Sequence, residues 1–147
     1  MLKKILLMLP IFVVIKSSEL ITMINNNEND LVISDKIHLD RLDVNAKNEI
    51  GQTALMAACE KGNFNLVNTL LQSGANVNAQ DNNGMTSMMY ASRSGKSLLI
   101  DLLASRGANE LITDNYGKKA YDYASTDLVR ALLSNPFRSA RVNFNQS

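Results

Sequence analysis

Apolar residues in the middle of the chain recur at helical spacing, in short segments separated by glycine. Residues 54–61 are rich in Ala and Met, Gly62 follows, and residues 63–72 form a second segment. The apolar positions of this second segment fall on one helical face: Leu66, Val67, Leu70 and Leu71. Because glycine tolerates the positive φ angle that often follows a helix, the pattern predicts two short helices joined at Gly62.

Polar residues mark where these helices begin and end. Thr53 precedes the first helix, where its hydroxyl can accept a hydrogen bond from a backbone N–H of the first turn, so we predict that it is the N-cap. Gly74 is predicted to end the second helix. The following residues up to Gly84 are mostly Asn and Asp, which favour turns, and they predict an extended turn segment.

The same arrangement returns at a fixed step of 33 residues, which indicates an internal repeat. Residues 45–77 align with residues 78–110 without a gap. The small residues that keep this step are Gly51, Gly84 and Gly117, and likewise Ala58, Ala91 and Ala124. One unit of two short helices cannot bury a core by itself, so the units are expected to stack side by side and share one.

The repeated motifs resemble those of the ankyrin-repeat family over residues 45–134. They are Gly51-Gln-Thr-Ala-Leu55, Ala57-Ala58, Gly62, Leu66-Val67-Asn-Thr-Leu70-Leu71 and Gly74-Ala-Asn-Val-Asn78-Ala79. The resemblance implies an all-α solenoid of stacked helix-turn-helix units with short β-hairpin fingers. It also implies that the protein works by binding another protein.

The chain departs from the family pattern at two places. The family's Thr-Pro-Leu-His stretch is Thr53-Ala-Leu-Met56 in one unit and Thr86-Ser-Met-Met89 in the next, so we expect Met56 and Met89 to fill the space of the missing histidines. The last unit is shorter by one helical turn, because Ala124 and Leu128 are closer than their counterparts Ala91 and Leu99. An atypical last unit is expected of a capping repeat.

These patterns divide the chain into six predicted segments. They are a signal peptide (1–18), an N-terminal cap or partial repeat (19–44), two repeats (45–77 and 78–110), a shortened capping repeat (111–134) and a flexible tail (135–147). Lys3 and Lys4 followed by eleven apolar residues are typical of a signal peptide, and the run is too short to span a membrane. Export to the periplasm or the medium follows if the segment is cleaved. If it is not, the segment is an N-terminal helix packed on the domain or a membrane anchor, and the protein is cytoplasmic or a membrane-tethered scaffold.

Composition argues against catalysis and cofactors. The chain has one cysteine, Cys59, and one histidine, His38, which are too few for a zinc site of nitrogen and sulfur ligands. Gly95-Lys96-Ser97 lacks the earlier glycine of a phosphate-binding loop, because Tyr90 stands at that position. The formal net charge of +1 does not suggest nucleic-acid binding. We therefore predict no enzyme activity, no cofactor and no small-molecule substrate.

The resemblance implies that the partner-binding surface is the concave face, made of the fingers and the exposed positions of each first helix. Ala57, Glu60 and Lys61 are expected to be exposed there, as are the counterparts of Ala57 and Glu60, which are Tyr90 and Arg93. Tyr and Arg are enriched in interface hot spots, so Tyr90, Arg93 and Tyr123 are predicted to form a binding patch. The fingers contribute Gln80 and Asn82. The alternatives are that these are ordinary exposed side chains, and that the finger residues serve turn geometry alone.

Overall fold

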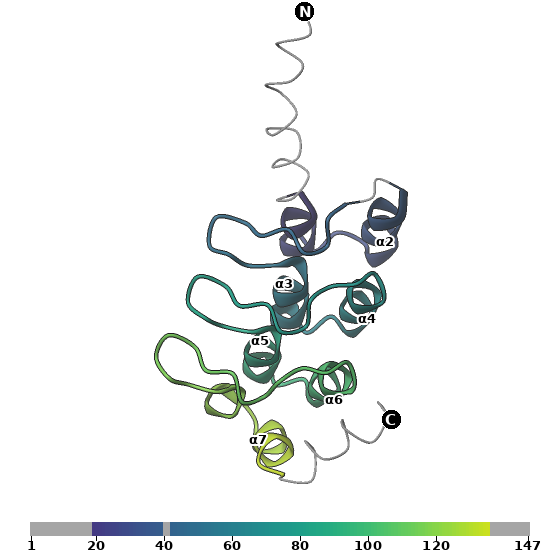
Figure 1. The fold of residues 1–147 in the computed structure, drawn as a ribbon. Helices are drawn as coiled ribbons and strands as arrows, with labels where there is room; N and C mark the ends of the chain where they lie inside the picture. The colour runs from purple at the N-terminus through teal and green to yellow at the C-terminus, as the bar shows by residue number, and fades with distance from the viewer. Residues whose placement is uncertain (1–18, 40–41, 136–147) are drawn as a thin grey trace, which may run out of the picture.

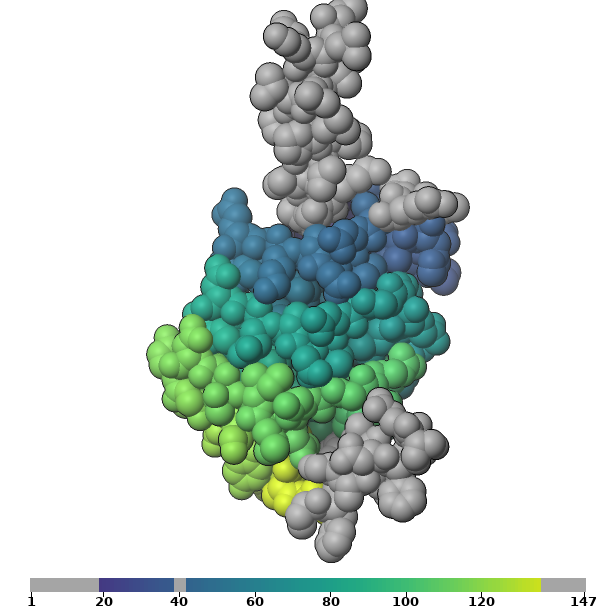
Figure 2. Space-filling model, viewed as in Figure 1, coloured from purple at the N-terminus to yellow at the C-terminus, as the bar shows by residue number. Residues whose placement is uncertain are grey.

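The protein is a stack of helix pairs, each preceded by a loop that projects to one side (Figure 1). The computed structural model describes residues 19–39 and 42–135. The inner column of helices comprises residues 19–25, α3 (Ala54–Lys61), α5 (Ser87–Ser94) and the 3₁₀ helix η1 (Ala120–Tyr123). The outer column comprises α2 (Asp30–Leu39), α4 (Phe64–Gln72), α6 (Ser97–Ser105) and α7 (Asp127–Leu133). In the face shown in Figure 2, the units follow one another as bands in chain order.

The helix ends lie where the polar residues and glycines predict them. Thr53 is the N-cap of α3, and its hydroxyl accepts a hydrogen bond from the Met56 amide at 3.4 Å. Gly62 follows α3 with φ of 71°, and Gly95 follows α5 with φ of 72°. Asn63 caps α4 through a 3.1 Å bond from the Leu66 amide to its side chain. In these helices, the polar residues and glycines of the repeat therefore set where each helix begins and ends.

Met56 and Met89 occupy the interior, as expected from the missing histidines. Both side chains are buried, and each lies in the first turn of an inner helix. The Thr53 amide donates to the Met56 sulfur at 3.4 Å, and the Thr86 amide donates to the Met89 sulfur at 3.5 Å. The methionines thus fill volume and also accept from a backbone N–H at the helix start, where thioether sulfur is a weak acceptor.

The core continues into the N-terminal segment, where residues 19–25 are helical and α2 follows. Leu20, Ile21, Met23 and Ile24 of this helix are all buried. In α2, Ile33 and Ile37 are buried, and α2 packs against α4. The segment therefore has the same helix-turn-helix arrangement as the units that follow, with residues 26–29 of its Asn-rich stretch forming the turn.

The projecting loops are the predicted fingers, which we define as finger 1 (43–53), finger 2 (76–86) and finger 3 (109–119). Fingers 1 and 2 each contain a single antiparallel bridge, Lys47 with Thr53 and Gln80 with Thr86. They are therefore tight loops with hairpin pairing at one position, and no longer strand is present in the residues that the structure describes.

The last unit is reduced, in keeping with its shorter sequence. Its inner helix is the single 3₁₀ turn η1, and its outer helix α7 is capped by the Thr126 hydroxyl at 3.2 Å from the Val129 amide. Ala120, Ala124 and Val129 remain buried against the preceding unit. The predicted signal peptide at 1–18 lies outside the described residues, as does the predicted flexible tail after residue 135. No described helix is both long and apolar enough to cross a membrane.

Candidate partner-binding surface

The fingers and inner helices form one side of the stack (Figure 1), and the predicted binding residues lie on these elements. Glu60 and Lys61 are exposed at the end of α3, and Arg93 is exposed near the end of α5. Gln80 and Asn82 are exposed on finger 2, and Tyr123 is half-buried at the end of η1. Tyr90, the remaining predicted binding residue, is buried.

Tyr90 is buried, so the expectation that its side chain is exposed is wrong. Only 5% of the residue is accessible, because its ring packs under finger 2 and its hydroxyl donates to Oδ2 of Asp81 at 2.7 Å. Asp81 is itself buried, and its Oδ1 accepts from the amides of Asn83 and Met85. Burial and the bond to Asp81 raise the pKa of Tyr90. Ala57, the counterpart of Tyr90 in α3, is also buried.

The same pair recurs in the last unit, where the Tyr123 hydroxyl donates to Oδ2 of Asp114. Oδ1 of Asp114 accepts from the amides of Tyr116 and Lys118, each at 2.9 Å. This contact raises the pKa of Tyr123 to about 12. Burial of Asp114 opposes its ionisation, but these three hydrogen bonds and the positive charge of Lys118 together outweigh it and hold its carboxyl pKa below the ordinary value. We call each Tyr–Asp pair a finger latch, because it ties a finger to the inner helix behind it.

Arg93 lies three residues after Tyr90 in α5, and its side chain extends toward solvent. Its guanidinium lies 5.0 Å from the centroid of the Tyr90 ring and donates to Oε1 of Glu60 at 2.6 Å. Glu60 also accepts from the Gln52 amide group at 3.4 Å. The side chains of Arg93 and Glu60 are 47% and 44% exposed, so the ion pair adds little stability and orients Arg93 instead.

Gln80 and Asn82 connect neighbouring fingers, a role beyond turn geometry that the sequence did not reveal. The side chain of Gln80 donates to the Thr113 carbonyl at 3.2 Å, and that of Asn82 donates to the Glu49 carbonyl at 3.0 Å. Their donors are thus used within the stack. A contact of either residue with a partner stays a prediction.

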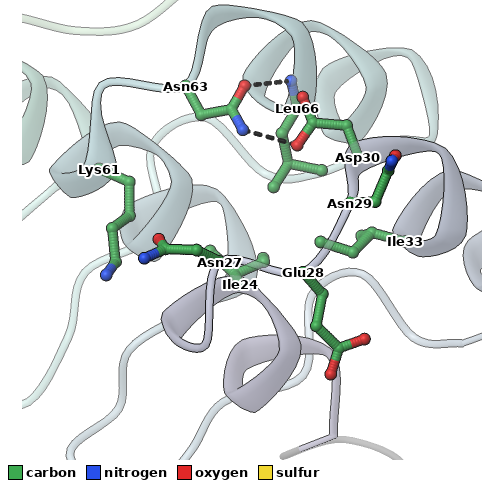
Figure 3. A pocket seen from close by; sticks show the side chains of 9 residues that line it. All are labelled: Ile24, Asn27, Glu28, Asn29, Asp30, Ile33, Lys61, Asn63 and Leu66. Atoms are coloured by element: carbon green, nitrogen blue, oxygen red, sulfur yellow. Dashed lines mark hydrogen bonds between the residues drawn. The ribbon is translucent and has the colours of Figure 1, made fainter.

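Lys61 bridges to the N-terminal unit, where its ammonium donates to the Asn25 carbonyl at 3.1 Å. Lys61 also borders a pocket of about 180 Å³ between the first two inter-helix turns. Figure 3 shows the Asn63 side chain of this pocket turned toward Asp30, and the two are joined by a 2.7 Å bond. The polar groups of this small pocket thus join the two turns, and we assign it no ligand.

Two groups of exposed side chains were missed by sequence reasoning. Tyr116, at the tip of finger 3, is 77% exposed, and Lys118 follows it on the same finger. Large apolar residues are exposed in the first turn of every outer helix: Leu31, Val32, Phe64, Leu98 and Leu128. Leu31 and Phe64 are 33 residues apart, and this repeated spacing was the sequence signal that could have identified the second group. The first group adds to the concave face, whereas the second lies at the inter-helix turns.

The described residues show no constellation for covalent or metal chemistry. Cys59 is fully buried, and desolvation raises its thiol pKa, which disfavours the reactive thiolate. No group of three His, Cys, Asp or Glu side chains that could hold a metal ion occurs within the ranges 19–39 and 42–135. The exposed side chains of the concave face are polar, aromatic and charged, which suits non-covalent recognition.

Comparison with known families agrees with this architecture. A family model described as ankyrin repeats, in three copies, matches residues 20–114. The match starts inside the segment predicted as an N-terminal cap or partial repeat and ends before most of the last unit. No curated protein matched the chain. Ankyrin repeats are generally protein–protein interaction modules and typically non-catalytic. From its repeated sequence, its stacked helix pairs and this match, the chain belongs to the ankyrin-repeat family.

Proposed function

We propose that this protein is a non-catalytic interaction module that binds one partner protein across its concave face. The observation that carries the proposal is the pair of finger latches, because they hold fingers 2 and 3 against the inner helices in a fixed geometry. A surface that is rigid before binding loses less conformational entropy when a partner docks. Glu60, Arg93 and Tyr116 project from this rigid frame toward solvent.

Export is the second part of the proposal, and it rests on the residues before the repeat. The basic start and the apolar run of residues 1–18 are typical of a signal peptide. The buried core residues Leu20 to Ile24 lie after residues 1–18, so a cut near Ser18 leaves them in the mature chain. The alternative is a membrane-tethered scaffold whose N-terminal segment remains attached.

Mass spectrometry of the protein from its own source separates these alternatives. A mature N-terminus near Ser18 or Glu19 is expected for the exported form, which directs the partner search to the periplasm or the medium. An intact Met1 would contradict export and would direct the search to membrane and cytosolic proteins.

Photo-crosslinking in the native source tests the binding face. A photoreactive amino acid is placed at Tyr116 on finger 3 and, in a separate variant, at Gln72, which is exposed at the end of outer helix α4. We expect a discrete adduct from position 116 and none from position 72. Equal adducts from both positions, or adducts from position 72 alone, would show that the concave face is not the binding surface.

A further inference from the structure

The last unit and the end of α5 together place two cations and two tyrosines on the concave face: Arg93, Tyr116, Lys118 and Tyr123. The Lys118 ammonium lies 5.8 Å from the centroid of the Tyr123 ring. The charge of Arg93 lowers the pKa of Tyr123, and the neighbouring Tyr116 raises it. We call these four residues the Tyr–Lys patch. It joins finger 3, η1 and the end of α5 into one surface.

The three carboxylates near this patch each have a partner within the protein. Asp114 is buried, and both of its oxygens accept hydrogen bonds from finger 3 and Tyr123. Asp122 accepts from the Lys119 backbone amide at 2.8 Å, and Asp127 pairs with Arg130. Lys118 forms no ion pair among the described residues. Lys118 and Arg93 therefore face solvent, and of the nearby carboxylates Asp114 is buried whereas Asp122 and Asp127 are exposed.

Arg93 retains binding capacity despite its partner Glu60. The contact uses one terminal nitrogen of the guanidinium, whereas arginine carries five N–H donors. Its plane is supported by the Tyr90 ring, and its side chain is 47% exposed. An incoming carboxylate can therefore be bound by Arg93 without displacing Glu60.

Among the three fingers, finger 3 alone carries a tyrosine and a lysine at the positions of Tyr116 and Lys118. The positions equivalent to Tyr116 and Lys118 are Asn83 and Met85 in finger 2, and Ile50 and Gln52 in finger 1. The surface thus changes along the stack, from finger 1, which carries a net negative charge and has the acidic Glu60 behind it, to the tyrosines and Lys118 of the last unit. Such a gradient fixes the direction in which a charged segment can lie.

We propose that the Tyr–Lys patch binds an acidic, extended segment of the partner protein. Carboxylates of that segment pair with Lys118 and Arg93, and its apolar side chains pack on the rings of Tyr116 and Tyr123. Tyrosine and arginine supply much of the binding energy at protein interfaces, and charge complementarity supplies specificity. This inference rests on the proposed function and adds the chemistry of the ligand.

The test uses the full chain and two short fluorescent peptides, one that alternates Glu with Leu and one in which Gln replaces every Glu. Fluorescence anisotropy is expected to show binding of the Glu peptide, weakened by added salt, and at least about tenfold weaker binding of the Gln peptide. Equal binding of both peptides, or no binding of the Glu peptide, would overturn the inference.

Two charge-reversed variants locate the binding site. Lys118→Glu alters the patch, whereas Lys119→Glu makes the same charge change one residue away, at a side chain that lines a separate hollow with Tyr121 and Leu133. We expect Lys118→Glu to weaken binding of the Glu peptide about tenfold and Lys119→Glu to change it much less. Equal losses would show attraction to net charge alone and would contradict the proposed patch.

The crosslinking experiment at Tyr116 distinguishes a failure of the acidic-segment inference from a failure of the proposed binding function. If the native partner crosslinks at position 116 while the Glu peptide fails to bind, the concave face is the binding surface and the acidic segment is wrong. If no partner crosslinks on the concave face, the proposed function itself fails.

Discussion

The hydroxyl of Tyr90 donates a 2.7 Å hydrogen bond to Oδ2 of Asp81, nine residues earlier in the chain. Both residues are buried, and the bond joins the middle of helix α5 to the turn of finger 2. Tyr123 and Asp114 repeat the bond at the same separation in the last unit. In the unit that contains finger 1, the residues equivalent to Asp81 and Tyr90 are Asn48 and Ala57, so finger 1 has no such latch.

Replacing Tyr90 with Phe should destabilise the fold. The substitution keeps the ring but leaves Oδ2 of the buried Asp81 without its donor, which costs about 1–3 kcal/mol of unfolding free energy. Urea denaturation followed by circular dichroism measures this difference. The control is Tyr116→Phe, whose hydroxyl is on an exposed residue and should change stability by less than about 0.5 kcal/mol. Equal stabilities of the two variants would contradict the role of the latch.

The latches also predict a loss of stability at high pH. Folding raises the pKa of Tyr123 from 10.0 to about 12, so the neutral phenol stabilises the native state. This contribution is complete below pH 10 and is lost as the pH rises toward 12. Burial acts in the same direction on Tyr90. Unfolding midpoints in urea should therefore fall across this interval, and less steeply in a Tyr90→Phe, Tyr123→Phe variant. An identical slope in that variant would refute the assignment.

Asp114 is expected to make the stability of the fold fall at low pH. Its carboxyl pKa is held below the ordinary value of 3.8, so its charged form stabilises the fold. This contribution is present above that value and is lost as the pH falls through the folded-state pKa. Asp114→Asn should make stability depend less on pH in the acid range, as measured by urea midpoints. An unchanged dependence would show that the carboxylate is not held by these hydrogen bonds.

Alanine at Gly51 should be costlier than alanine at Gly74. Both glycines have positive φ, 75° and 88°, so both substitutions place a side chain in the left-handed region. A Cβ at Gly51 would lie 2.8 Å from the Asn82 backbone nitrogen, whereas at Gly74 it meets no atom within 4 Å. We expect an extra cost of about 1–3 kcal/mol at Gly51 from forcing fingers 1 and 2 apart. Equal costs in thermal or urea unfolding would show that the fingers separate freely.

Cys59 should react with a thiol reagent only when the protein unfolds. The side chain is fully buried, and desolvation raises its thiol pKa, so the native protein holds almost no accessible thiolate. Labelling rates should therefore follow added urea. A Cys59→Ser, Gln72→Cys variant provides an exposed thiol for comparison and should react at once. Serine suits the first site because Ser92, its counterpart, bonds the Met88 carbonyl at 2.8 Å. Rapid labelling of the native wild type would contradict the packing of α3.

The repeat made much of the fold predictable, because each unit carries its own start and stop residues. Helix α3 spans the predicted residues, and α4 begins one residue later than predicted, since Asn63 serves as its cap. The helix at residues 19–25 was missed, although Leu20, Ile21, Met23 and Ile24 have helical spacing, because the preceding apolar run was interpreted as a signal peptide.

The binding surface was harder to predict, because a tyrosine at a helix position can point outward or under a loop. The burial of Tyr90 depends on Asp81, which the sequence places in another element. A signal was present in the internal alignment: Asp and Tyr occur together at this spacing in two units, and both are replaced in the other. The side-chain bonds of Gln80 and Asn82 depend on the spacing between fingers, which no single unit encodes.

The contacts between fingers have a consequence for how such a chain can grow. Asn45 bonds the Gly74 carbonyl and the Asn76 amide, and Asn78 bonds the Gly107 carbonyl and the Asn109 amide in the same way. Each of these asparagines thus ties its own finger to the start of the next finger by the same pair of bonds. Duplicating residues 78–110 within the gene would create a junction made of contacts that the chain already uses. The molecule can therefore lengthen by whole units that pack through the existing interface. Each added copy of residues 78–110 would contain its own Tyr–Asp finger latch.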